Sequence, residues 1–349
     1  MAVVASLLCA SMLLGSGVSS AAGAAGPWVD SPVTFSAGGV TIYATYRHPA
    51  HPRGPIPAAL LIAGSGPTDR NGNSPEEPGP VDTLRTLADW LSQDGVASLR
   101  YDKLGSGKTG LGRYLFDPDA IGIKPFEQEA VAALVFLARQ RDVDRARLAV
   151  VGHSEGALFA LLVASGAAGP APPVHALALL EPLSLRYLDL ISDQITAQIA
   201  TAVSAGQLTT TAAATLQQEL AAAVSSLRAN GTLPADVPSD LSSVFSPSTS
   251  LFLSQADRYD PAQLAARLAA RTPVLVSCSN DDIQVSCSEV DHLVEGLTQA
   301  QAAVDLVQLS GVDHVLKVDP SLTAADYGKP LPFSPQLRAA LASFVHQNL

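Results

Sequence analysis

Ser154 lies in a G-x-S-x-G pattern, with His153 and Glu155 on either side of it. The residues before this pattern, "RLAVVG", are typical of a buried strand, and the residues after it, "ALFALLVA", are typical of a helix. A sharp turn between the two would expose the serine Oγ near the positive end of the helix, and glycines permit such a turn. We therefore predict that Ser154 is a nucleophile; the alternative is a serine in an ordinary glycine-flanked loop.

An activated serine needs a histidine base, and His314 has the most suitable position. It stands in "SGVDHVLK", in a loop directly after a predicted strand, where the carboxyl edge of a sheet should be. The other six histidines precede the central strands, begin a strand, lie on predicted helices or lie within the serine motif itself. We predict that His314 is the base; a surface histidine without a role is the alternative.

Three carboxylates are candidates for the acid that orients this histidine. Asp281 and Asp282, in "VLVSCSNDDIQV", follow a predicted strand, and Glu181 follows the strand before it. The resulting chain order of serine, acid and histidine is that of α/β-hydrolases, and not that of chymotrypsin-like or subtilisin-like enzymes. We favour Asp282, because its D-x-x-V spacing to Val285 resembles the usual acid loop of α/β-hydrolases.

Acyl transfer at a serine also needs an oxyanion hole, which consists of two aligned backbone N–H groups. One donor should be the N–H of Glu155, directly after the nucleophile. The other should come from the loop after an earlier strand, here "AGSGPTDRNGN", in which Ser65 stands between two glycines. We predict that Ser65 and Glu155 supply the two donors; a plain Gly/Pro turn is the alternative for the loop.

Strand-like and helix-like segments alternate along most of the chain. Residues 33–49 predict a β-hairpin around a pair of glycines. Alternation of strands with helices predicts an α/β fold with a mostly parallel sheet that is covered on both faces. Short apolar strands are expected at residues 58–66, 96–102, 147–152, 174–182, 273–279 and 303–311, and amphipathic helices at 81–95, 126–141 and 334–349.

One segment interrupts the alternation. Residues 186–260 are rich in Ala, Ser, Thr, Leu and Gln, with helical patterning and no clear strand. We predict that this segment is a helical cap over the active site, inserted between two parts of an α/β core, residues 26–185 and 261–349. A decorative insertion is the alternative.

Five motifs occur together in a fixed order: "AGSGPTDRNGN", "RYDKLGSGKT", "GHSEG", "DIQV" and "DHVLK". Through them, most of residues 57–349 resembles bacterial α/β-hydrolase esterases related to the serine-aminopeptidase-like hydrolases. The resemblance implies a carboxylesterase acting on small-molecule esters of short acyl chains, with no metal or organic cofactor. The apolar composition of the predicted cap extends this expectation to medium chains. A serine peptidase, an acyltransferase and a non-catalytic binding protein remain alternatives.

Composition limits the partners and the location. The net charge of −11 and the lack of a basic cluster argue against nucleic acid and anionic membrane surfaces as binding partners.

Residues 1–25 combine an apolar stretch too short for stable membrane insertion with small residues near Ala24. They predict a cleaved signal peptide and a secreted or periplasmic protein. In such a protein Cys278 and Cys287 can form a disulfide, the alternative being two buried thiols. The oligomeric state is left open.

The segment "LGSGKTG" resembles the end of a phosphate-binding loop. That pattern needs a glycine five residues before Gly107, and this chain has Asp102 there. We therefore expect that the segment does not bind a nucleotide.

Overall fold

The computed structural model describes residues 27–77 and 79–349. The signal peptide predicted for residues 1–25 lies outside the described residues. No helix in the described part of the chain is long and apolar enough to cross a membrane.

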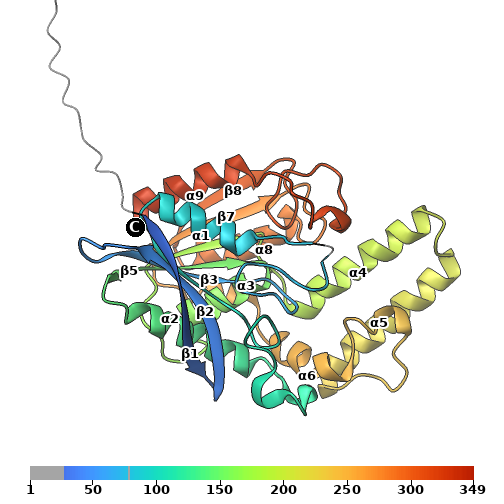
Figure 1. Ribbon diagram of the computed structural model, residues 1–349. Helices are drawn as coiled ribbons and strands as arrows, with labels where there is room; N and C mark the ends of the chain where they lie inside the picture. Colours follow the sequence, from blue (N-terminus) through green and yellow to red (C-terminus); the bar gives the residue numbers. More distant parts are fainter. Residues whose placement is uncertain (1–26, 78) are drawn as a thin grey trace, which may run out of the picture.

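An eight-stranded sheet forms the centre of the molecule, in the order β1-β2-β4-β3-β5-β6-β7-β8 (Figure 1). β1 and β2 form the predicted hairpin, and β2 pairs antiparallel with β4. From β4 to β8 all neighbouring strands are parallel, so their carboxyl ends share one edge of the sheet. The strands are β1 (Trp28–Ala37), β2 (Val40–Pro49), β3 (Ile56–Ile62), β4 (Ala97–Tyr101), β5 (Val143–His153), β6 (Ala176–Leu180), β7 (Pro273–Ser279) and β8 (Ala303–Leu309).

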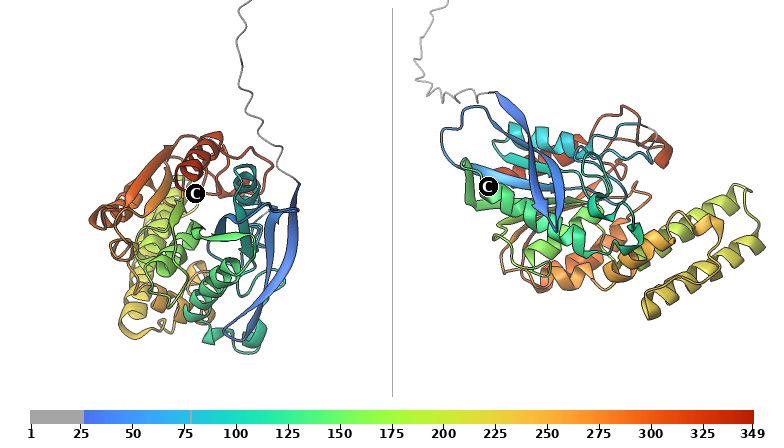
Figure 2. Two further views of the ribbon diagram at one scale, coloured as in Figure 1. Left: turned by 90° about the vertical axis from the view of Figure 1, so that its left-hand side faces the viewer. Right: turned by 60° about the horizontal axis from the view of Figure 1, so that its bottom comes forward.

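Successive residues of a strand point to opposite faces of the sheet, and in the central strands the residues on both faces are apolar. Helices therefore cover both faces of this sheet. In β3, Leu61 belongs to the same buried cluster as Leu84 and Leu341, while Leu60 belongs to the cluster of Leu134 on the other face. Figures 1 and 2 show the resulting layers. One face is covered by α1 (Thr83–Gln93) and α9 (Pro335–Asn348), and the other by α2 (Lys124–Ala138), α3 (Glu155–Ala164) and α8 (Cys287–Gln299).

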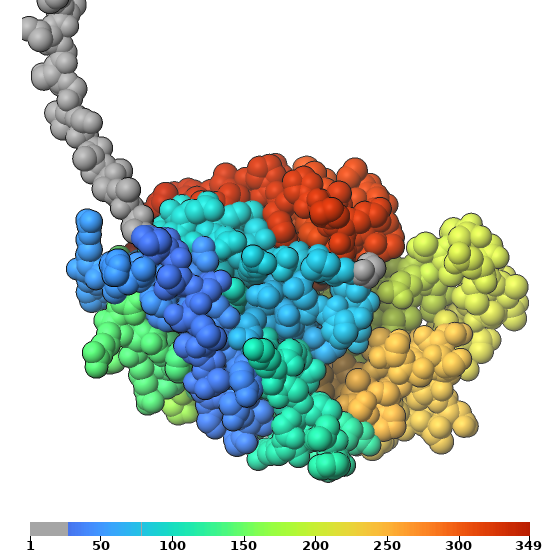
Figure 3. Space-filling model, viewed as in Figure 1, coloured from blue at the N-terminus to red at the C-terminus, as the bar shows by residue number. Residues whose placement is uncertain are grey.

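A helical segment lies between β6 and β7 and stands to one side of the sheet as a lobe (Figure 3). Two of its long helices pack side by side and extend away from the rest of the molecule (Figure 2). The segment consists of α4 (Tyr187–Ser204), α5 (Thr210–Asn230), the short 3-10 helix η3 (Ser239–Leu241), α6 (Pro247–Ala256) and α7 (Pro261–Ala265); other 3-10 helices are η1 (Gly112–Tyr114), η2 (Pro118–Ala120) and η4 (Ala324–Asp326).

Asp257, a buried aspartate at the end of α6, joins three helices of this segment. Its carboxylate is 2.6 Å from the Arg186 guanidinium at the start of α4 and 2.9 Å from Arg228 near the end of α5. It also accepts the N–H of Leu188 at 2.9 Å. Because hydrogen-bonded buried charges fix geometry, the start of α4 and the ends of α5 and α6 are held in one arrangement relative to one another.

Candidate active site

Ser154 lies at the turn between β5 and α3, as the sequence pattern predicts. Its backbone has φ 53° and ψ −122°, a strained conformation that lifts the side chain away from both elements. Two glycines make the turn possible: a Cβ at Gly152 would collide with the backbone of Gly156, and a Cβ at Gly156 would collide with the carbonyl oxygen of Ile62. The turn thus depends on the close approach of α3 to β3 and β5.

The structure brings Ser154, His314 and Asp282 together from three separate loops. His314 Nε2 lies 2.9 Å from Ser154 Oγ, and His314 Nδ1 lies 2.7 Å from Asp282 Oδ2. The other Asp282 oxygen accepts the backbone N–H groups of Gln284 and Val285, at 2.7 and 3.1 Å. The D-x-x-V segment therefore forms a tight loop whose own backbone N–H groups bind the Asp282 carboxylate and hold it in place.

The two other candidate acids do not contact His314. Asp281 accepts the N–H of Gly311 at 2.6 Å and so ties its loop to the loop that carries the histidine. Glu181 is completely buried and accepts the N–H of Ser279 at 3.0 Å. Burial and the neighbouring Asp282 carboxylate raise the pKa of Glu181 well above its usual range. This shift favours the neutral form of Glu181.

The two neighbouring histidines have opposite pKa shifts. Burial lowers the pKa of His314, but the charge and hydrogen bond of Asp282 outweigh this effect, and the net shift is upward. Burial lowers the pKa of His153 to about 4, so its ring is neutral. His153 Nε2 lies 2.7 Å from the backbone oxygen of His314 and must carry the proton of this bond. His153 therefore holds the backbone of His314, a role that its place in the serine motif does not reveal.

The loop after β3 passes directly beside the serine. A Cβ at Gly64 would stand 3.2 Å from the Ser154 Cβ, a tight contact that would force one of the two residues to shift. Ser65 follows Gly64, and Glu155 begins α3, where the first N–H groups of a helix have no partner within it. In residues 27–77 and 79–349, the N–H of Ser65 donates to no backbone oxygen. Both predicted oxyanion donors are thus available next to the serine.

The segment that resembles a phosphate-binding loop surrounds a carboxylate of its own chain. Asp102 accepts the N–H of Lys108 at 2.8 Å and the guanidinium of Arg70 at 2.6 and 2.9 Å. A Cβ at Gly107 would collide with this carboxylate. Since Arg70 belongs to the loop after β3, the Asp102 carboxylate anchors the loop that carries Ser65.

Two cavities meet at Ser154. The larger has a volume of about 540 Å³ and lies between the serine and the helical segment. Apolar side chains from the core and from α4 and α6 line it, among them Phe126, Leu183, Leu190 and Phe252. The smaller, of about 250 Å³, is more polar and is lined by His314, Ser154, Tyr327, Glu76 and Glu77. In the described chain, no group of three or more His, Cys, Asp or Glu side chains is placed to hold a metal ion.

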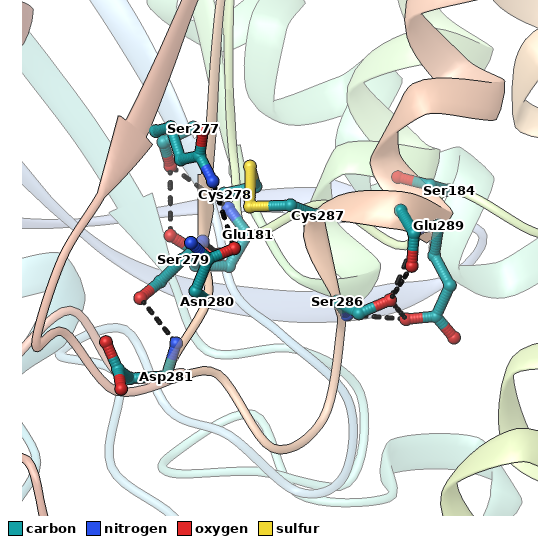
Figure 4. The surroundings of a disulfide bond; sticks show 12 residues. Glu181, Ser184, Ser277, Cys278, Ser279, Asn280, Asp281, Ser286, Cys287 and Glu289 are labelled. Atoms are coloured by element: carbon teal, nitrogen blue, oxygen red, sulfur yellow. Dashed lines mark hydrogen bonds between the residues drawn. A yellow bond between two sulfur atoms is a disulfide. The ribbon is translucent and has the colours of Figure 1, made fainter.

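A disulfide joins Cys278, near the end of β7, to Cys287, the first residue of α8 (Figure 4). It closes the loop that carries Asp281 and Asp282. Beside it, Ser286 and Glu289 form a capping box that fixes the start of α8. The acid loop is therefore held at both ends.

We expect that loss of this disulfide lowers turnover. Closing a loop of about ten residues contributes roughly 2.7 kcal/mol to the free energy of unfolding in a chain-entropy estimate. The effect on activity should exceed the effect on stability, because Asp282 must stay within hydrogen-bond reach of His314. The measurement is the kinetics and melting of Cys278→Ser with Cys287→Ser. Intact-mass analysis after thiol alkylation is the control: two free thiols in the oxidised, folded protein would contradict the bond, and unchanged turnover would limit it to a structural role.

Comparisons with known proteins agree with this architecture. No protein-family model matches the sequence. Among curated proteins, the esterase EstD of Thermotoga maritima is 33% identical over 141 residues, which are 39% of this chain and 31% of EstD. The chain thus spans less than a third of the length of this relative.

Solved structures match over nearly the whole chain. An esterase of Pyrococcus furiosus has a TM-score of 0.56 at 15% identity, covering 92% of this chain and 91% of its own. Est1E of Butyrivibrio proteoclasticus, with ferulic acid bound, has a TM-score of 0.55 at 17% identity, covering 90% and 98%. Dipeptidyl peptidase 4 of Porphyromonas gingivalis has a TM-score of 0.53 at 14% identity, covering 92% and 35%. The chain has the predicted α/β-hydrolase fold, which also carries peptidases.

Proposed function

We propose that the protein is a serine hydrolase that cleaves carboxylic esters of short to medium acyl chain through an acyl-enzyme intermediate. One observation carries the proposal: Asp282, His314 and Ser154 form a continuous hydrogen-bonded line, with distances of 2.7 and 2.9 Å, at the meeting point of two cavities. The similarity to EstD and to esterase structures supports an ester as the substrate.

The proposed reaction has two halves. His314 Nε2 takes the Ser154 proton as Oγ attacks the ester carbonyl, and the Asp282 carboxylate stabilises the imidazolium and fixes its tautomer. The N–H groups of Ser65 and Glu155 bind the negative oxygen of the tetrahedral intermediate. The imidazolium then protonates the leaving alcohol, which departs and leaves an acyl-serine. Water, deprotonated by His314, attacks the acyl group. The imidazolium then returns its proton to Ser154 Oγ as the bond between Oγ and the acyl carbon breaks, which releases the acid and free Ser154.

A series of p-nitrophenyl esters from acetate to palmitate tests the proposal. We expect the highest kcat/KM for short to medium chains, because the larger cavity is apolar and limited in size. A peptidase is the second candidate, because Glu76 and Glu77 line the smaller cavity and carboxylates there would attract a free amino group. Cleavage of aminoacyl p-nitroanilides without cleavage of the esters would overturn the proposal in favour of a peptidase.

We also propose that the helical segment selects the acyl chain. Phe252→Ala on α6 should enlarge the larger cavity and move the preferred acyl chain to greater length. Phe245→Ala is the matched control, because Phe245 is buried in the same segment but does not line the cavity. A replacement of residues 186–259 by a Gly/Ser linker should change chain-length preference more than the rate of phosphonate labelling of Ser154. An unchanged preference in the folded variants would contradict the lid role.

Export to the periplasm or the medium is part of the proposal. It rests on the signal-like residues 1–25 and on the disulfide, which is compatible with an oxidising compartment.

A further inference from the structure

Lys103 is a buried cation directly beside the candidate oxyanion hole. It follows β4, its side chain is only 3% exposed, and it lines the larger cavity together with Ser65 and Glu155. Its ammonium donates to the carbonyl oxygen of Gly64 and lies 3.1 Å from Glu155 Oε1. Buried lysines are rare unless they are paired, so these two contacts explain why the charge is tolerated there.

The contact with Gly64 acts on the N–H of Ser65. The carbonyl of Gly64 and the N–H of Ser65 belong to the same peptide unit, which is planar and trans, so the two groups point in opposite directions. An ammonium that binds the carbonyl oxygen therefore fixes the direction of the N–H. It also polarises the peptide unit, which makes the N–H a stronger donor.

The contact with Glu155 acts on the other donor. The Glu155 carboxylate is held between Lys103 at one oxygen and the Tyr187 hydroxyl, 2.5 Å away, at the other. Both contacts anchor the residue whose own N–H is the other predicted oxyanion donor. Glu155 is the carboxylate in ion-pair contact with Lys103, while burial raises the pKa of the neighbouring Glu129 to about 8.

We propose that Lys103 is a positioning residue that aligns both oxyanion donors, the N–H groups of Ser65 and Glu155, through one ammonium group. This inference rests on the proposed function, because it assigns a role within acyl transfer. Tyr187 is the first residue of α4, so the same network connects the helical segment to the serine turn. The sequence signal for this role is only a lysine in "RYDKL", which by itself indicates nothing about an oxyanion hole.

Lys103→Met tests the proposal, with matched oxygen and thiono esters as substrates. An oxyanion hole is built for a negative oxygen and gives sulfur much less stabilisation, so a well-aligned hole favours the oxygen ester. Removal of one donor costs about 10² to 10³ in kcat, and Lys103→Met would leave both donors present but misaligned. We therefore expect kcat for the oxygen ester to fall on the order of 10²-fold, with KM nearly unchanged. The ratio of oxygen-ester to thiono-ester rates should fall by a similar factor.

Two further variants keep the test decisive. Lys103→Met with Glu155→Gln removes both charges, and should fold even where the single variant does not, with the same loss of the rate ratio. Lys317→Met is the matched control: Lys317 is equally buried and donates to the carbonyls of Tyr327 and Lys329, away from both donors. It should lose stability without a change in the rate ratio.

The outcomes separate the inference from the proposed function. Wild-type ester hydrolysis that depends on Ser154, with an unchanged rate ratio in folded Lys103 variants, would overturn the role of Lys103 alone. A wild-type protein that hydrolyses no ester would overturn the proposed function, and the role of Lys103 with it.

Discussion

Ser154→Ala is expected to reduce ester turnover by about 10⁴- to 10⁶-fold, since loss of a triad nucleophile costs this much in related chemistry. The remaining groups would still bind the ester, so KM should change far less than kcat. His314→Ala should have nearly the same effect, because the serine hydroxyl would lose the base 2.9 Å from its oxygen. The measurement is single-substrate kinetics with the best p-nitrophenyl ester.

A fluorophosphonate probe provides the direct check on Ser154. The wild-type protein should be labelled at one serine, and Ser154→Ala should not be labelled. Ser184→Ala is the matched control, because Ser184 is buried, follows Leu183 of the larger cavity, and donates its hydroxyl to the carbonyl oxygen of Pro182. If Ser154→Ala is still fully labelled, Ser154 is not the nucleophile.

Asp282→Asn should produce the second largest loss, about 10² to 10⁴ in kcat/KM, smaller than that of the serine variant. The asparagine amide can donate to His314 Nδ1, which would place the single proton of the neutral ring on Nε2 and remove the base. The pH profile should change as well. Activity needs neutral His314, and Asp282 raises the pKa of His314 above 6.5, the usual histidine value. As the pH is lowered, wild-type activity should therefore begin to fall at a pH higher than 6.5. In Asp282→Asn this fall should move to lower pH.

The same kinetic measurement, made on variants of Asp281 and Glu181, decides between the three candidate acids. Asp281→Asn should retain activity within about fivefold, because its amide oxygen can still accept the Gly311 N–H. Glu181→Gln should also have a small effect, since the raised pKa of the buried Glu181 favours its neutral form, whose charge the glutamine keeps. A loss in either variant as large as that of Asp282→Asn would reassign the acid.

The strands and the serine turn could be predicted because their signals are local. "RLAVVG" and "ALFALLVA" show the change from strand to helix within a few residues, and the glycines of the motif fit where α3 approaches β3. The acid loop is similar, because Asp282 bonds to N–H groups two and three residues later. Such features depend little on the rest of the chain.

The contacts that complete the site could not be predicted in this way. His153 holds the backbone of a residue 161 positions away, and Tyr187 reaches Glu155 across 32 positions. The upward pKa shift of Glu181 comes from burial and from Asp282, and it depends on β6 and β7 being neighbours in the sheet. These contacts depend on the order of strands in the sheet, for which the sequence offers no local pattern.

The Asp102 carboxylate has a consequence for how such sequences diverge. Arg70 belongs to the first of the five motifs, while Asp102 and Lys103 belong to the second and Glu155 to the third. The ion pairs Arg70–Asp102 and Lys103–Glu155 therefore join the three motifs, and Asp102, Lys103 and Glu155 are buried. A substitution of one partner alone leaves an uncompensated buried charge, at a cost of about 3 to 5 kcal/mol. We expect the two positions of each pair to covary among homologues, so that substitutions in one of the three motifs are accompanied by substitutions in another.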